Sequence, residues 1–139
     1  MSEVADYTIS LRFFGDDLDP DVLSSLLGAQ PSTSCRKGDV FHGKVSDRIE
    51  KTGKWLLKLP SKPGEPFELR IETLLSGLTQ DLTVWRELAE KYNADVFCGV
   101  WLGSSNEGME LPPRLMTQLA ERGLHLGLDI YAPDEDDDG

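Results

Sequence analysis

The chain has 139 residues, of which 39% are apolar, so it is long enough for one domain with its own core and too short for two. Its 25 acidic and 14 basic residues give a net charge of −11, and an acidic body that repels phosphates disfavours nucleic-acid binding. The longest apolar runs are too short to cross a bilayer, no secretory signal is evident at the N-terminus, and there are only two cysteines. We therefore expect a cytoplasmic protein without a disulfide framework and without a membrane partner.

The first half begins with a predicted strand at residues 7–14, in which apolar and polar residues alternate. Asp19 is suited to cap a helix whose first turn contains Pro20, and Gly28 is suited to end it. Residues 30–50 show no clear period and predict a long loop, with a short strand at Val40 and Phe41. A strand at residues 53–59 follows and places Trp55 in the core.

The second half is predicted to contain helices at residues 67–78 and 82–92, because apolar residues recur there at helical spacing. Residues 94–103 are apolar enough for a central strand, with Cys98 as a small core residue. A loop at residues 104–108, a helix from Pro112 to near Gly123, and a closing strand at residues 124–131 complete the chain. Alternation in that last strand places His125 on its outward face.

Two segments repeat one design, in which a strand-like run and a polar loop lead to Leu-x-Pro and a short helix. Six positions match at one constant offset: Leu18 with Leu111, Pro20 with Pro113, Val22 with Leu115, Leu23 with Met116, Leu26 with Leu119, and Leu27 with Ala120. We predict a single α+β domain over residues 1–132, with a mainly antiparallel sheet of about four strands and helices on one face. Two β-α-β halves would build it, in an arrangement related to ferredoxin-like folds. The acidic residues 133–139 predict a disordered tail.

A family resemblance rests on the order and spacing of several short motifs. They are Phe13 and Gly15, Asp19-Pro20, Leu26-Leu27-Gly28, Pro31, Arg36-Lys37-Gly38-Asp39, Gly53-Lys54-Trp55 and Leu128-Asp129-Ile130-Tyr131. In these the chain resembles the bacterial family catalogued as domain of unknown function 4279, over nearly its whole length up to the acidic tail. The resemblance implies an α+β domain and supplies no activity and no catalytic residue.

Charge is distributed unevenly along the chain. Residues 36–62 contain eight basic and three acidic side chains, which leaves the remainder strongly acidic. Arg36 and Lys37 open a basic loop, residues 36–51, that could hold an anionic ligand or an acidic surface, or could simply balance the acidic body. Asp129 and Tyr131 share the outer face of the last strand, where they could pair with a cation from that loop. The candidate binding residues are therefore Arg36, Lys37, Asp129 and Tyr131.

Catalytic and metal-binding patterns are weak. Cys35 and His42 could form a nucleophile and its base, but a loop cysteine and a solvated histidine are the simpler interpretation because such pairs need a third orienting group. The acidic run from Asp16 to Asp21 lacks the glycine and glutamate of a calcium loop. No zinc spacing or phosphate loop is present. We predict no catalytic residue, no metal and no cofactor, and hence a protein that is not an enzyme.

Two functional hypotheses follow. The first is a protein-interaction module, of an immunity or regulatory type, that binds a basic partner through its acidic surface. The alternative is a domain that binds a small anionic ligand with the basic loop. The sequence favours neither a monomer nor an oligomer.

Overall fold

The computed structural model describes residues 4–104 and 108–133, with side chains described from Asp6 onward. The predicted loop at residues 104–108 falls mostly outside this range, and so does the predicted disordered tail apart from Pro133. In the described part of the chain, no helix has the length and apolar character needed to span a membrane.

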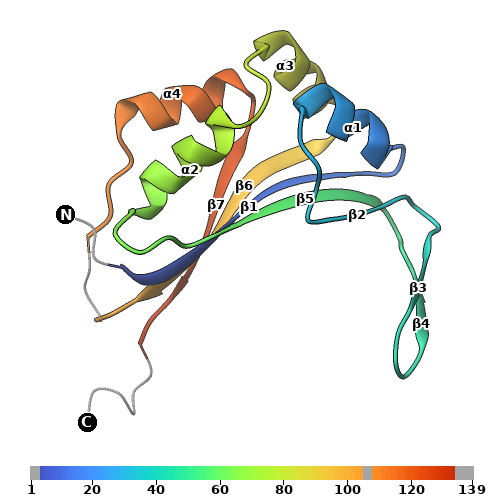
Figure 1. The fold of residues 1–139 in the computed structure, drawn as a ribbon, viewed down its shortest axis with the longest axis horizontal. Coiled ribbons are helices and arrows are strands. Elements are labelled where there is room, and N and C mark those ends of the chain that lie inside the picture. The colour runs from blue at the N-terminus through green and yellow to red at the C-terminus, as the bar shows by residue number, and fades with distance from the viewer. Residues whose placement is uncertain (1–3, 105–107, 134–139) are drawn as a thin grey trace.

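Strands and helices follow one another along the chain in two halves (Figure 1). The first half contains β1 (Val4–Gly15), α1 (Pro20–Leu27), β2 (Thr33–Cys35), β3 (Val40–His42), β4 (Asp47–Ile49) and β5 (Gly53–Pro60). The second half contains α2 (Phe67–Ser76), α3 (Leu82–Lys91), β6 (Asn93–Leu102), α4 (Pro113–Glu121) and β7 (His125–Tyr131). The predicted strands at both ends of the chain and all four predicted helices are confirmed.

One mixed sheet organises the fold. Its order is β2-β5-β1-β6-β7, in which β1 pairs antiparallel with both β5 and β6, β2 pairs antiparallel with β5, and β7 pairs parallel with β6. The predicted α+β class and the mainly antiparallel pairing are confirmed, but the predicted count of about four strands is wrong because there are five. The ferredoxin-like relationship is not confirmed and stays a prediction.

The segment at residues 30–50, predicted to be a loop with one short strand, contains three strands. β3 confirms the short strand predicted at Val40 and Phe41, whereas β2 and β4 were not predicted. β2 adds to the edge of the sheet beside β5, and β3 pairs with β4 in a separate antiparallel hairpin. Each of these strands has three residues, and nearly all their side chains are exposed. An element without a buried face has no apolar alternation, so its sequence carries no period-2 signal.

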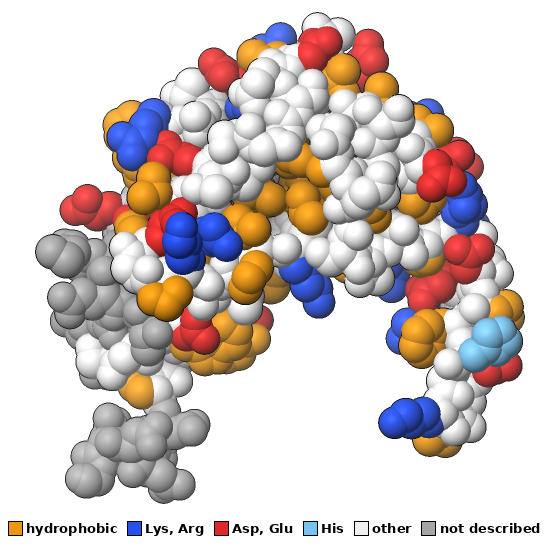
Figure 2. All heavy atoms as spheres, viewed as in Figure 1, with side chains coloured by type: hydrophobic (Ala, Val, Ile, Leu, Met, Phe, Trp, Pro, Cys, Tyr) orange, Lys and Arg blue, Asp and Glu red, His pale blue; other side chains and the backbone are white. Residues whose placement is uncertain are grey.

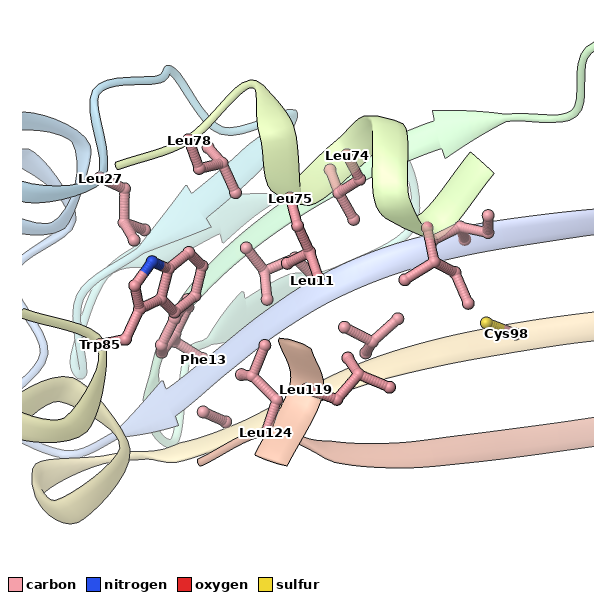
Figure 3. Packing of buried hydrophobic residues seen from close by; sticks show 14 of the residues in the cluster. Leu11, Phe13, Leu27, Leu74, Leu75, Leu78, Trp85, Cys98, Leu119 and Leu124 are labelled. Atoms are coloured by element: carbon pink, nitrogen blue, oxygen red, sulfur yellow. The ribbon is translucent and has the colours of Figure 1, made fainter. Parts of the chain in front are cut away.

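The core lies between the sheet and the four helices, which all cover the same face of the sheet (Figure 1). Phe13 occupies its centre, edge-on to Trp55 at 5.9 Å and stacked with Trp85 at 6.3 Å between ring centroids. Each indole N–H has an acceptor, since Trp55 donates to Ser24 Oγ at 3.0 Å and Trp85 donates to the Thr79 carbonyl at 2.8 Å. Figure 3 shows Phe13, Trp85 and Cys98 among the buried side chains. Trp55 is fully buried as well, so the core positions predicted for Trp55 and Cys98 are confirmed.

The first helix is set by its own sequence. Asp19 is its N-cap and accepts a hydrogen bond from the Asp21 N–H at 3.0 Å, Pro20 opens the first turn, and Gly28 ends it at φ 77°. That left-handed conformation favours glycine because it carries no Cβ. The predicted caps of this helix are therefore confirmed.

The two predicted halves are not structurally equivalent. β6, α4 and β7 form a β-α-β unit with neighbouring parallel strands, whereas β5 separates β2 from β1 in the first half. The constant offset also aligns buried positions with exposed ones: Val22 is 49% exposed whereas its counterpart Leu115 is fully buried. The buried pair Leu23 and Leu27 corresponds to Leu115 and Leu119, one residue away from the sequence match. Both helices still contribute to one common core.

Candidate functional site

The start of the basic loop is tied to the first helix. Arg36 Nη2 lies 2.8 Å from Asp19 Oδ1 and 3.0 Å from Asp21 Oδ2, and Lys37 Nζ lies 3.3 Å from Asp16 Oδ2. Burial opposes ionisation of Asp19, but the Asp21 N–H and the Arg36 guanidinium outweigh it, so the pKa of Asp19 is lowered. Arg36 and Lys37 are thus neutralised within the chain, by acids that cap and precede α1.

The end of the loop converges on one carboxylate. Glu50, with only 8% exposure, lies between two cations: its Oε1 is 3.0 Å from Arg48 Nη2 and its Oε2 is 3.1 Å from Lys54 Nζ. The hydrogen bond from Lys54 lowers the pKa of Glu50, and Arg48 adds to this effect against the cost of burial. Backbone bonds from Gly38 N–H to the Glu50 carbonyl and from Glu50 N–H to the Asp39 carbonyl, each 2.8 Å, close the loop.

Asp129 and Tyr131 lie at the other side of the sheet. They belong to β7, and β5, β1 and β6 separate β7 from the β2 edge that leads into the basic loop. Tyr131 Oη donates to Asp129 Oδ2 at 2.6 Å, which raises the pKa of the Tyr131 phenol. The predicted pairing of these two residues with Arg36 is therefore wrong, and the four candidate residues form two separate pairs. Whether either pair binds a ligand stays a prediction.

The residues between these pairs form a surface that no helix covers. We call it the open face: the outward positions of the large sheet, which include Thr8, Ser10, Arg12, Phe14, Lys54, Leu56, Lys58, Asp95, Phe97, Gly99, Trp101, His125, Gly127, Asp129 and Tyr131. Arg12 lies at its centre, with Nε and Nη2 bonded to the two oxygens of Asp95 at 2.8 and 2.6 Å. The guanidinium carbon is 4.3 Å from the Phe97 ring centroid and 5.3 Å from that of Phe14. The open face is thus both aromatic and polar.

Two glycines make room for the aromatic rings of the open face. A methyl group at Gly99 would lie 3.1 Å from the Trp101 ring and 2.9 Å from Thr8 Oγ1, and one at Gly127 would lie 3.2 Å from the Phe97 ring. Trp101 and Tyr131 stack at 5.0 Å with 13° between their planes, although they are 39% and 43% exposed. Sequence reasoning missed this surface. The available signal was the strand parity that places Phe14, Phe97 and Trp101 opposite the core.

The β3–β4 hairpin projects beyond the body of the protein. We call residues 39–50 the arm. Its apolar side chains are exposed: Val40 by 50%, Phe41 by 55%, Ile49 by 65% and Val45 by 99%. Arg48 lies 5.1 Å from the Phe41 ring centroid, and His42 Nδ1 lies 3.2 Å from Asp47 Oδ1. Figure 2 shows a hollow beside the arm, on the side of the molecule away from the helices.

The arrangement gives little support to catalysis by Cys35. Its thiol donates to the Thr52 carbonyl at 3.5 Å, and burial raises its pKa, so the thiolate is disfavoured. His42, its predicted base, is paired with Asp47 instead. Cys98 is fully buried, and burial raises the pKa of its thiol to about 12. Within residues 4–104 and 108–133, no group of three histidine, cysteine or acidic side chains is placed to hold a metal ion.

A small hollow lies near the start of β7. Its volume is about 300 Å³, and its lining residues are Ala89, Tyr92, Asn93, Ala94, Asp95, Gly123 and His125. Asp95 already accepts two hydrogen bonds from Arg12, one at each carboxylate oxygen. His125 is exposed at its rim, on the outward face as predicted.

Fold and surface together define a single α+β domain with helices on one side of its sheet, an open face on the other, and a projecting arm. The chain belongs to the family described as Domain of unknown function (DUF4279), whose model matches residues 5–133. Searches of curated proteins and of solved structures found no match.

Proposed function

We propose that this protein is a non-enzymatic interaction module that binds a basic partner protein through its arm and the adjoining open face. The observation that carries the proposal is the exposed apolar surface of the arm, where Phe41, Val45 and Ile49 are all more than half exposed. Among the residues that the structure describes, β3 and β4 pair only with each other, and the core contains no residue of the arm that would explain these exposed side chains. Apolar and aromatic side chains that water reaches in one place are typical of a binding surface.

Exposed acidic side chains on the arm and near its base support a basic partner. Asp16, Asp21 and Asp47 have side chains that are 63%, 90% and 59% exposed, even though Lys37 lies beside Asp16, Arg36 beside Asp21 and the His42 imidazole beside Asp47. The chain as a whole carries a net charge of −11. An apolar contact bordered by acidic groups favours a partner that surrounds its own apolar residues with lysine and arginine. Neutralising a basic toxin or regulating a partner would be forms of this function.

The alternative, an anionic ligand on the basic loop, has weaker support. Arg36 and Lys37 already face three carboxylates, and Arg48 and Lys54 share Glu50. An anion would have to displace these acids from the same cations. Under this alternative, phosphate or a dicarboxylate would raise the melting temperature, and Arg36→Ala would abolish that rise.

The test uses the full chain with a photo-crosslinking amino acid at position 41, expressed in the native host. We expect a crosslink to one basic protein, at a yield that falls as salt is raised because screening weakens the attraction. A matched probe at position 69 in α2, where Leu69 is 43% exposed, should not give that product.

Loss of the apolar contact should prevent the binding. In a Phe41→Ser, Ile49→Ser double variant the purified partner should bind at least tenfold more weakly, whereas Leu69→Ser with Met116→Ser should leave affinity unchanged. Met116 is 49% exposed on α4, so this control removes a comparable apolar area from another surface. Equal affinity of both double variants, or a position-41 probe that captures no basic protein, would refute the proposal.

A further inference from the structure

The described part of the chain leaves the outer edge of β7 without a neighbouring strand. β7 has seven residues, lies last in the sheet order, and pairs only with β6 among the residues that the structure describes (Figure 1). Lysine, proline and other charged residues usually block pairing at a sheet edge. The sequence HLGLDIY contains no lysine, arginine or proline, and its one acidic residue, Asp129, is hydrogen-bonded to Tyr131. The opposite edge, by contrast, is formed by the three-residue strand β2. Within residues 4–104 and 108–133, no strand other than β6 pairs with β7, so its outer backbone donors and acceptors can serve another strand.

Apolar side chains extend along the same edge. Leu126, Leu128 and Ile130 face the helices, since they align with the buried residues Val96, Cys98 and Val100 of β6. Leu128 nevertheless remains 38% exposed and Ile130 remains 47% exposed. The helices therefore leave the last part of this apolar row uncovered at the edge.

We propose that β7 pairs antiparallel with β7 of a second copy of this chain and joins the two sheets into one. In a two-fold symmetric pair whose axis passes at Leu128, all seven residues of the strand find a partner. Leu128 then faces its own counterpart, and Leu126 faces Ile130 of the second copy. The apolar row becomes self-complementary and continuous. A register centred on any other residue of β7 would pair fewer residues.

The outward side chains fit the same register. His125 would lie opposite Tyr131 of the second copy, and Gly127 opposite Asp129 of the second copy. The stacked rings of Trp101 and Tyr131 would then continue onto His125 of the second copy. Because the axis is perpendicular to the sheet, both open faces point the same way, and the hollow at His125 gains a second wall. The dimer would offer two arms on one side.

This interface is independent of the proposed partner binding and differs from it in its response to salt. Each copy carries a net charge of −11, so association of two copies is opposed by like-charge repulsion, which salt screens. We expect the dimer to tighten as salt is raised, whereas binding of a basic partner should weaken. The two proposals can therefore fail separately.

Sedimentation velocity of the full chain over a range of concentrations tests the inference. We expect a mass of twice 15.4 kDa at micromolar concentrations. Ile130→Lys should raise the dimer dissociation constant on the order of 100-fold, because a symmetric interface contains each change twice. Val22→Lys, which replaces a residue 49% exposed on α1, should leave it unchanged. Urea unfolding, measured at a protein concentration where both variants are monomeric, separates loss of the interface from loss of the fold. Equal unfolding midpoints would show that Ile130→Lys disrupts the interface and not the fold.

The register has its own test. In a Cys35→Ser background, a short bis-maleimide should join Leu128→Cys chains into covalent dimers and should leave Val22→Cys chains monomeric. A monomer at all concentrations and salt conditions would overturn the proposal, as would a dimer that Ile130→Lys leaves intact. A dimer in which Leu128→Cys is not crosslinked would overturn the register.

Discussion

At the residue scale, Gly53 lies where three segments of the chain meet and leaves no room for a side chain. It pairs with Gly15 at the end of the β1–β5 ladder, beneath the turn that carries Leu18. A methyl group there would lie 2.7 Å from the Gly15 carbonyl oxygen and 2.9 Å from Leu18 Cβ. Because backbone cannot move aside as a side chain can, we expect Gly53→Ala to lower the free energy of unfolding by about 1–3 kcal/mol. Urea denaturation measures this.

Gly77 provides the matched control for that substitution. It ends α2 at φ −83°, and the atom nearest to an added methyl group would be 3.7 Å away. Gly77→Ala should therefore be neutral or stabilise by about 0.5 kcal/mol, since alanine restricts the unfolded chain. If the two alanine variants unfolded at the same urea concentration, the close packing assigned to Gly53 would be wrong.

At the scale of elements, Glu50 couples the arm to the sheet in a manner that depends on pH. Its hydrogen bond with Lys54, supported by Arg48, lowers its pKa below the ordinary value of 4.5. A carboxylate whose pKa is lower in the folded state stabilises the fold fully above its unfolded pKa, and that stabilisation is lost as pH falls through the folded pKa. We expect stability to fall below about pH 4.5, and the fall to be smaller in Glu50→Gln.

Thermal melting of both proteins between pH 3 and 7 measures this difference. The pKa of Asp19 is also lowered from its ordinary value of 3.8, so its protonation reduces the stability of the fold at low pH in the same way. This loss of stability should remain in the Glu50→Gln protein. Glu121→Gln serves as the control, because Glu121 is an exposed acid at the end of α4. Parallel curves for Glu50→Gln and the native protein would contradict the assigned role of Glu50.

The elements also differ in how far their sequence determines them. α1 was predictable because Asp19, Pro20 and Gly28 act on bonds within a few residues of themselves. β5 was predictable because Trp55 and its alternating neighbours face the core. The arm was predictable only in part: the short strand at Val40 and Phe41 is confirmed by β3, but β4 and the hairpin pairing were missed, since this pairing buries neither face and leaves no periodic pattern. Local bonds and burial leave signals in sequence, and an exposed hairpin leaves almost none.

The candidate site required knowledge that lies beyond any single element. Arg36 was correctly placed on a loop, and Asp129 was correctly placed on the outward face of a strand. Arg36 follows β2 and Asp129 belongs to β7, however, and three strands separate β2 from β7. Strand order depends on contacts between distant parts of the chain, which no local pattern records. The carboxylates that bind Arg36 were in fact near in sequence, in the cap and first turn of α1.

At the scale of the whole molecule, the described residues form a packed body and an arm, and the arm joins the body at its base. The core contains no residue of the arm, and two backbone hydrogen bonds of 2.8 Å hold the ends of the arm together. The body therefore supplies the stability, and the arm supplies exposed apolar and charged groups. This separation is what a binding module requires, because its contact surface can then vary without changing the fold.

Excising the arm tests that division. We expect a chain in which two glycines replace residues 40–49 to keep its cooperative unfolding, with a free energy of unfolding within about 1 kcal/mol of the native value, because the closing bonds between Gly38, Asp39 and Glu50 remain. Urea denaturation followed by tryptophan fluorescence measures it, since Trp55 and Trp85 are both buried in the body. The β7 dimer should survive the excision, while binding of a basic partner should be lost. If the shortened chain unfolded without cooperativity, the arm would be part of the folding unit, and its exposed apolar residues would need another explanation.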